Sequence, residues 1–148
     1  MFEISDFYHY CKTHQVDVIP YDGCPKPGAT IRDGSFYAVC LDFTKIKSTR
    51  LLRGICYHEL GHVATGALHK VDSPYELVER SEYRANRWAA ENYLTETAFR
   101  EAFSAGCTEL WQLEEYFELP GSDIQAALNY WIISRGVDFS KLEEPSCT

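Results

Sequence analysis

The sequence lacks three features whose absence narrows its function. No apolar run approaches the roughly 20 residues that a membrane-spanning helix needs, so we expect no transmembrane segment. The first twelve residues contain acids and a lysine but no long apolar core, so we expect no secretory signal. No internal repeat or low-complexity tract is visible. These observations favour one cytoplasmic domain over a membrane, secreted or repeat protein.

The cysteines also lack an ordered pattern. There are six of them, and none forms a C-x-x-C pair. Without a signal peptide, free thiols in a reducing cytoplasm are a better interpretation than a disulfide framework. The six residues are Cys11, Cys24, Cys40, Cys56, Cys107 and Cys147.

Positive charge is scarce in the second half of the chain. Residues 1–70 carry eight Lys or Arg and seven Asp or Glu, whereas residues 71–148 carry six and fifteen. An acidic half repels the phosphate backbone of nucleic acids. We therefore expect no direct nucleic-acid partner, and a DNA-binding regulator is a disfavoured hypothesis.

Strand patterns are confined to the first third of the chain. The stretch "VDVIP" predicts a short strand that stops at Pro20, and "YDGCPKPG" predicts a loop. Asp33-Gly34 predicts a hairpin turn between residues 29–31 and a strand over 35–43. Both faces of that second strand are largely apolar, so it is expected to be covered on both sides or to leave a face for a ligand.

Helical patterns occupy the rest. A first helix is expected behind a Ser5 cap, and a second from Ser48 or Thr49 to Gly66. Ser73 followed by Pro74 predicts the start of a third, long helix. Further helices are expected over 96–105, 108–117 and 122–134. The fold class is therefore α+β in a single domain, with the sheet and the first three helices in 1–96 and a helical part in 97–148.

The stretch "CYHELGHVATG", residues 56–66, carries an H-E-x-x-H pattern. On a helix, His58 and His62 are four residues apart and project from one face, where they can share a tetrahedral Zn²⁺ ion. Glu59 lies about 100° round the helix from His58, which places it beside the metal. There it can take the proton from a water molecule as a general base.

A catalytic zinc ion needs a third protein ligand. The next helix offers acids, and Glu82 is preferred because Asn86 lies four residues further on the same face. The amide of Asn86 could hydrogen-bond to a ligand imidazole and fix its tautomer. Glu79 lies on that face too and is the alternative ligand.

The alternative to a metal site is a structural helix that carries two histidines by chance. Five-residue patterns do recur in unrelated proteins. Gly61 favours the functional interpretation, because it costs about 1 kcal/mol of helix propensity that a purely structural helix would not give up. Its presence predicts the close approach of a strand or a partner helix at this point.

The stretches "YHELGHVATG" and "SEYRANRWAAENYL" together resemble the ImmA/IrrE family of zinc metallopeptidases. The second matches the family pattern E-x-x-A-N-x-F-A, with Trp88 in place of phenylalanine, and the resemblance covers roughly residues 29–96. It implies a zincin-like fold with ligands His58, His62 and Glu82 and with Glu59 as catalytic base. The chain departs from the family where it continues as "NYLTET", without the usual leucine-rich stretch and proline.

The resemblance also implies a setting in bacteria, phages or mobile elements, where members cleave or antagonise helix-turn-helix repressors. The leading hypothesis is a zinc endopeptidase that acts on one protein. Zincins bind their substrate as an extra strand along a sheet edge, and the strand over residues 35–43 is the candidate edge. His69 and Tyr75 are weak candidates for an oxyanion donor. The rival hypothesis is a metal-stabilised interaction module, an anti-repressor or antitoxin-like protein, that binds its partner without cleaving it.

The end of the chain resembles a helix-turn-helix, since residues 108–136 read as two helices around a Pro-Gly break. Its acidic residues favour a packing or partner-binding role over DNA contact. Its aromatic residues are expected in the core: Trp111, Tyr116, Phe117, Tyr130 and Trp131. Cys56 is expected to be a small buried apolar group on the far side of its helix from His58.

Overall fold

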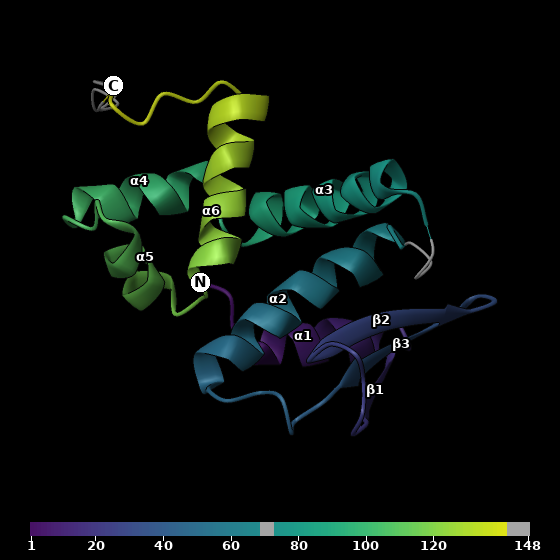
Figure 1. Cartoon of the computed structure of the whole chain (residues 1–148). Helices are drawn as coiled ribbons and strands as arrows, with labels where there is room; N and C mark the ends of the chain where they lie inside the picture. The colour runs from purple at the N-terminus through teal and green to yellow at the C-terminus, as the bar shows by residue number, and fades with distance from the viewer. Residues whose placement is uncertain (69–72, 142–148) are drawn as a thin grey trace.

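The chain forms an α+β structure with a small mixed sheet (Figure 1). The computed structural model describes residues 1–68 and 73–141. Within them the elements are α1 (Ile4–Thr13), β1 (Asp17–Pro20), β2 (Gly28–Asp33), β3 (Phe36–Leu41), α2 (Thr49–Thr65), α3 (Tyr75–Asn92), α4 (Glu96–Ser104), α5 (Leu110–Phe117), α6 (Gly121–Asn129) and the π-helix η1 (Tyr130–Ser134). The predicted α+β class is confirmed. No helix in this part of the chain is long and apolar enough to cross a membrane.

The sheet has the order β1-β3-β2. β1 runs parallel to β3, and β2 runs antiparallel to it. The expectation that the strand within residues 35–43 lies at an edge is therefore wrong. The chain passes from β1 to β2 first, and β3 then returns between them, so that β1 and β2 are the edges.

The turn between β2 and β3 lies one residue later than the sequence predicted. Asp33 pairs with Phe36, so the two turn residues are Gly34 and Ser35. Gly34 has a φ of 61°, in the left-handed region. A glycine at the first central position is the requirement of a type II′ hairpin turn, so Gly34 determines the register.

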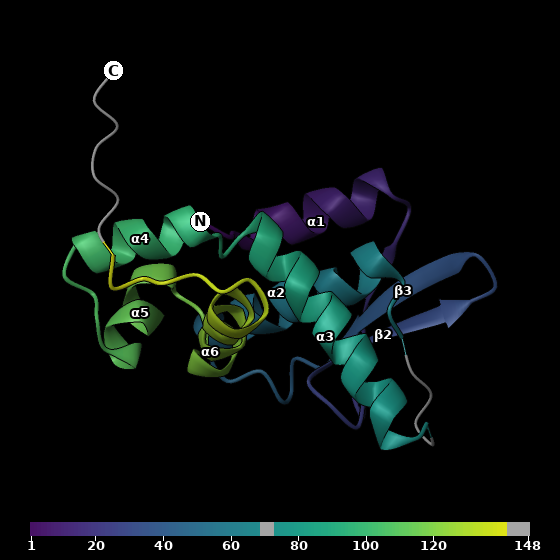
Figure 2. The ribbon, with the colours of Figure 1, turned by 90° about the horizontal axis from the view of Figure 1, so that it is seen from above.

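Helix α2 forms the middle layer of the molecule, with the sheet on one side and α3 on the other (Figure 1). Its ends were predicted from local signals. The Ser48 side chain accepts a hydrogen bond from the Leu51 N–H at 3.1 Å, and Gly66 ends the helix with a φ of 65°. Seen from above, α3 crosses over α2 (Figure 2).

Two other helix starts differ from the sequence predictions. Glu3, not Ser5, caps α1, because its carboxylate and that of Asp6 form a reciprocal capping box. Pro74, not Ser73, occupies the cap position of α3, which begins at Tyr75. Leu77 and Tyr83 of α3 are exposed although their spacing suggested burial, because the buried face of this helix is the one that carries Ser81, Ala85 and Ala89.

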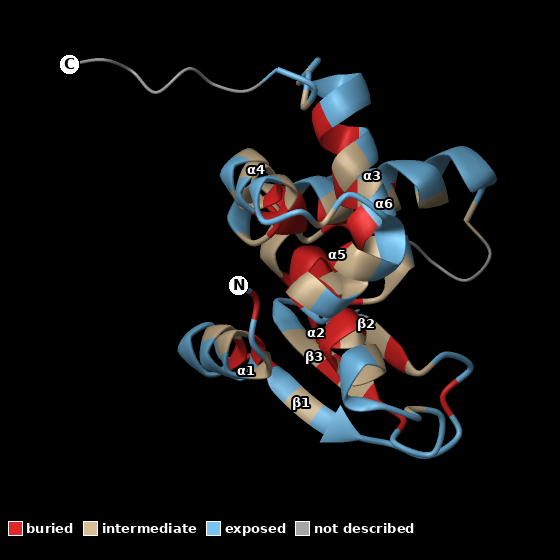
Figure 3. Cartoon of the chain, turned by 90° about the vertical axis from the view of Figure 1, so that its left-hand side faces the viewer, coloured by how far each residue is buried: buried red, intermediate tan, exposed pale blue. Residues whose placement is uncertain are grey.

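The core lies between α2 and its neighbours, where the buried residues of several elements meet (Figure 3). Val39 and Leu41 of β3 belong to the same apolar cluster as Leu60 of α2 and Phe7 of α1. Cys56 belongs to this cluster and is fully buried, as predicted. The face of α2 that packs on the core is therefore separate from the face that carries the histidines.

The C-terminal helices are joined to this core through a buried arginine. Arg53 of α2 donates hydrogen bonds to the carbonyls of Phe2 and Glu118, the latter at 2.9 Å, and pairs with the Glu3 carboxylate at 2.8 Å. This guanidinium connects α2, the N-terminus and the segment between α5 and α6. Of the C-terminal aromatics, Phe117, Tyr130 and Trp131 are buried, whereas Trp111 is exposed, contrary to expectation.

Candidate metal centre

The two histidines occupy the last two turns of α2. His58 and His62 project from one face with their ring centroids 4.8 Å apart. His62 is buried, and His58 is partly exposed. Because Ser48 and Gly66 cap both ends of the helix, this spacing is held by a fully formed helix rather than by a frayed end.

Gly61 allows α3 to approach α2 closely at this point. A Cβ atom at Gly61 would lie 2.4 Å from the backbone carbonyl oxygen of Ala85, closer than side chains tolerate. The predicted close approach of a partner helix is therefore confirmed. Glu82 lies one turn before Ala85 on α3, so the same approach brings its carboxylate to the imidazoles.

Three potential ligand atoms converge here. Glu82 Oε2 lies 3.0 Å from His58 Nε2, Glu82 Oε1 lies 3.3 Å from His62 Nε2, and the two Nε2 atoms are 3.1 Å apart. Donors that share a zinc ion at about 2.0–2.1 Å in tetrahedral geometry lie about 3.3 Å apart. His58, His62 and Glu82 can therefore hold a metal ion.

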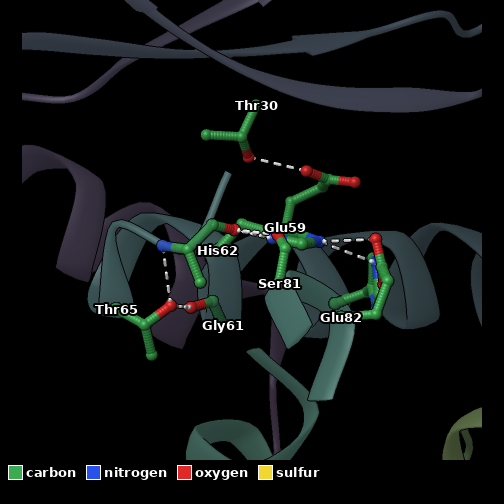
Figure 4. Close-up of polar contacts among 9 residues, drawn as sticks. Thr30, Glu59, Gly61, His62, Thr65, Ser81 and Glu82 are labelled. Carbon is green, nitrogen blue, oxygen red and sulfur yellow. Dashed lines mark hydrogen bonds and ion pairs between the residues drawn. The ribbon is translucent and has the colours of Figure 1, made fainter. Parts of the chain in front are cut away.

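The tautomer of His62 also suits metal binding. Its Nδ1 atom lies 2.6 Å from the Ala67 carbonyl oxygen, which can only accept, so Nδ1 carries the proton. The other ring nitrogen, Nε2, is the one that faces Glu82, 3.3 Å from Oε1. The Ser81 hydroxyl donates to the same carbonyl at 2.6 Å, which fixes Ala67 between α2 and α3 (Figure 4).

The charges in the cluster favour ionised Glu82. Burial by itself raises the pKa of this carboxyl, but hydrogen bonds from His58 and His62 outweigh burial and hold the pKa well below its usual range. Burial lowers the pKa of His58, yet the Glu82 hydrogen bond and the nearby charges of Glu59, Glu82 and Asp123 raise it to about 8. The metal-free cluster is thus a carboxylate bound to a proton on His58, which a cation can replace.

Glu59 lies next to this cluster and faces the sheet. It is buried, and its Oε2 atom accepts a hydrogen bond from the Thr30 hydroxyl of β2 at 2.6 Å (Figure 4). No other residue in the described ranges 1–68 and 73–141 hydrogen-bonds to this carboxylate. One oxygen is therefore fixed by the edge strand, while Oε1 accepts no hydrogen bond from a described residue.

The structure places Asn86 elsewhere than predicted. The amide makes no hydrogen bond with His58 or His62 among the residues that the structure describes; it lines a hollow with Ala126 and Asn129 of α6. Asn86, one turn after Glu82, therefore faces α6 rather than α2. The role expected of Asn86 is filled for His62 by the Ala67 carbonyl.

The remaining candidates also lie away from the cluster. Tyr75 is 74% exposed, and the Tyr75 hydroxyl hydrogen-bonds to Glu79 at the start of α3. The structure therefore brings neither Tyr75 nor the alternative ligand Glu79 to the histidines. His69 lies outside the described residues.

Three participants were missed by the sequence: Thr30, Ala67 and Asp123. Asp123 of α6 has an oxygen only 2.8 Å from where a Cβ of Gly54 would be, one turn of α2 before His58. Burial raises the pKa of Asp123 to about 6, although the charge of His58 opposes this. For Asp123, the sequence does offer a signal in Gly54, a second helical glycine four residues before His58. Such a glycine indicates that another segment packs closely against α2 at this point.

No family model, curated protein or solved structure matches this chain. The geometry of the cluster is therefore the basis for a functional proposal.

Proposed function

We propose that this chain is a zinc-dependent endopeptidase with a zincin-like site that hydrolyses a peptide bond in one specific protein. The convergence of two imidazoles and a carboxylate, with a buried glutamate beside them, is the observation that carries this proposal. Two histidines with one glutamate form a donor set that catalytic zinc sites use. The resemblance to the ImmA/IrrE family favours a helix-turn-helix repressor as the substrate and a bacterial or phage-infected cytoplasm as the setting.

Each residue has a distinct role in this proposal. His58, His62 and Glu82 would hold the ion, which when bound would acidify water and polarise the scissile carbonyl. Glu59 takes the proton of the attacking water and passes it to the leaving amine as the C–N bond breaks. The Thr30 hydroxyl holds Oε2 of Glu59 by a hydrogen bond, which restricts the orientation of the carboxylate.

In this proposal the substrate binds along β2 rather than along β3. β2 is an edge of the sheet, packs against α2 and carries the Thr30 that contacts Glu59. A peptide added to this edge as a further strand would run past Glu59. The scissile bond and the general base would then meet without a further rearrangement.

The test compares the wild type with Glu59→Gln and Glu82→Ala. Each protein is first incubated with zinc and then with a lysate of its source cells, and new protein N-termini are identified by amine labelling and mass spectrometry. We expect a new terminus with the wild type only, with zinc retained by Glu59→Gln and lost by Glu82→Ala. Glu79→Gln is the matched control, because Glu79 is exposed and bound to Tyr75.

Two outcomes would overturn parts of this proposal. Undiminished cleavage by Glu59→Gln would remove Glu59 from catalysis. A wild type that binds zinc one to one but yields no new terminus, while capturing one protein from the lysate, would favour the metal-stabilised binding module instead.

A further inference from the structure

Two cysteine thiols meet on the sheet at the segment that joins β1 to β2. Cys24 lies in the 21–27 segment and is 6% exposed, and Cys40 lies on the central strand β3 and is partly exposed. Burial raises the pKa of Cys40, and the Cys24 thiol beside it raises that pKa further. The pair is separate from the histidine cluster and has no part in the proposed hydrolysis.

Backbone hydrogen bonds hold the segment that carries Cys24 against the end of β3. The Tyr21 N–H donates to the Leu41 carbonyl at 3.0 Å, and the Asp42 N–H donates to the Pro27 carbonyl at 2.8 Å, so both ends of the 21–27 segment are bound to the end of β3. Cys24 is therefore held over β3 by its neighbours on both sides, not by a chance contact of side chains.

Asp42 anchors the middle of the segment. Its buried carboxylate accepts a hydrogen bond from the Gly23 N–H at 3.1 Å, and the ammonium group of Lys45 donates to the Cys24 carbonyl. Along an extended chain, residues two apart point to the same side, so Cys40 and Asp42 face the segment together. The thiols can then approach each other with little backbone movement.

A second cysteine pair in the same fold provides a contrast. Cys11 and Cys56 lie near enough to interact electrostatically, but they are 1% and 0% exposed. Burial raises the pKa of Cys11 to about 11 and that of Cys56 to about 12. Cys11 and Cys56 are therefore closed to a reagent from solution, whereas Cys40 is partly exposed and can be reached.

We propose that Cys24 and Cys40 form a dithiol modification site that a small disulfide, such as oxidised glutathione, converts into an internal disulfide. The Cys40 thiolate attacks one sulfur of the reagent, forms a mixed disulfide and releases one glutathione thiolate, which takes up the proton that Cys40 lost. Cys24 then loses its own proton and displaces the second glutathione. Two protein thiols are oxidised, and one small disulfide is reduced to two thiols.

The expected consequence is a tether across the first part of the sheet. The bond would close a loop from Cys24 to Cys40 that contains β2 and its turn. Such a cross-link restricts the unfolded chain, so the oxidised protein should unfold at a higher temperature than the reduced one. The tethered segment ends at Gly28, where a Cβ would lie 2.3 Å from Ile55 of α2, so the bond would also hold β2 against α2.

The experiment uses the full folded chain, freshly reduced and freed of reductant, and oxidised glutathione as the probe. After acid quenching and alkylation of free thiols, digestion and mass spectrometry locate the cross-linked peptides. We expect a Cys24–Cys40 link, a raised unfolding temperature, and reversal of both by dithiothreitol. Cys24→Ser should instead stop at one glutathione adduct on Cys40, and Cys11→Ser should leave the link unchanged.

Other outcomes would overturn the proposal. One is stable glutathione adducts without the Cys24–Cys40 link in the wild type. Another is a Cys11–Cys56 link that forms as fast as the Cys24–Cys40 link. A sample oxidised in urea serves as a control, because it shows which cysteines the unfolded chain links. If the folded sample gave the same set of disulfides as the urea sample, the fold would not be what brings Cys24 and Cys40 together.

Discussion

At the scale of single residues, the protons of the cluster decide how it takes up a metal ion. The Ala67 carbonyl accepts a hydrogen bond from His62 Nδ1, so Nε2 is the His62 nitrogen that faces a bound cation. His58, with its pKa raised to about 8, is protonated at neutral pH in the metal-free protein. Metal uptake therefore competes with the proton on His58.

The first prediction follows from this competition. Below pH 8 the apparent zinc affinity should fall about tenfold for each pH unit, because each binding event must release the His58 proton. Titration against a chromophoric chelator at pH 6, 7, 8 and 9 measures it. Affinity that stays constant from pH 6 to 8 would show that His58 is neutral before the metal arrives.

The same shift affects the stability of the metal-free fold. The pKa of His58 is about 8 in the folded protein against 6.5 for the free side chain. Its stabilising contribution is therefore fully present below pH 6.5 and is lost as the pH rises through 8. Glu82 acts in the opposite range: its lowered pKa stabilises the fold above pH 4.5, and this contribution is lost as the pH falls further.

The second prediction concerns Asp123, whose pKa is raised, whereas the pKa of the Glu82 carboxyl is lowered. Its pKa is raised from 3.8 to about 6, so the folded state binds the proton more tightly and loses stability as the pH rises through 6. Asp123→Asn removes this loss. In zinc-free urea denaturation, the variant should gain about 1 kcal/mol relative to wild type between pH 5 and pH 8. An equal difference at both pH values would mean that Asp123 is not destabilised by burial.

At the scale of elements, the contact of α2 with α3 at Gly61 and Ala85 determines whether the cluster exists. The third prediction is that Gly61→Ala destabilises the protein by about 1–3 kcal/mol, because the added methyl group collides with the Ala85 backbone. It should also weaken zinc binding, since separating the helices moves Glu82 away from the imidazoles. Chemical denaturation and the chelator titration measure the two effects.

Gly121→Ala is the matched control for that substitution. It adds the same methyl group in α6, where the nearest atom is a terminal oxygen of Glu114, which can move aside. We expect unchanged zinc affinity and unchanged or slightly higher stability, as helix propensity favours alanine. If Gly61→Ala behaved like this control, the close contact would not position Glu82.

Elements were predictable from sequence where local chemistry sets them. Ser48 and Gly66 set the ends of α2 through a side-chain cap and a left-handed residue, and both are readable along the chain. The central position of β3 in the sheet could not be predicted from the sequence. Strand order depends on which partners a strand finds across the chain, and the alternation of apolar residues is the same in a central strand and in an edge strand.

At the scale of the whole molecule, the cluster combines segments that no local pattern connects. His58 and His62 follow from helical periodicity, and Glu82 from a second helix that packs on the first. Thr30 reaches Glu59 across 29 residues of sequence, and the Ser81 hydroxyl reaches Ala67 across 14. Only packing of the sheet and α3 on α2 creates these contacts. This is why the sequence predicted that Glu59 and the three donors lie together but missed Thr30 and Ala67, which bind them.

The last prediction concerns the whole fold, because the three donors belong to two different helices, α2 and α3. A zinc ion that binds the folded state alone stabilises it by about 2.7 kcal/mol at a free concentration of 100 times its dissociation constant. For a chain of this length that corresponds to a rise in unfolding temperature of roughly 5–10 °C.

Thermal unfolding monitored by circular dichroism, with a chelator or with buffered zinc, measures this rise. His58→Ala and Glu82→Ala should each remove it, because each takes away one donor of the cluster. Glu79→Ala should keep it, since Glu79 is exposed and bound to Tyr75. A rise that survives Glu82→Ala but disappears in Glu79→Ala would move the third ligand one turn along α3 and would require the first turns of that helix to repack on α2.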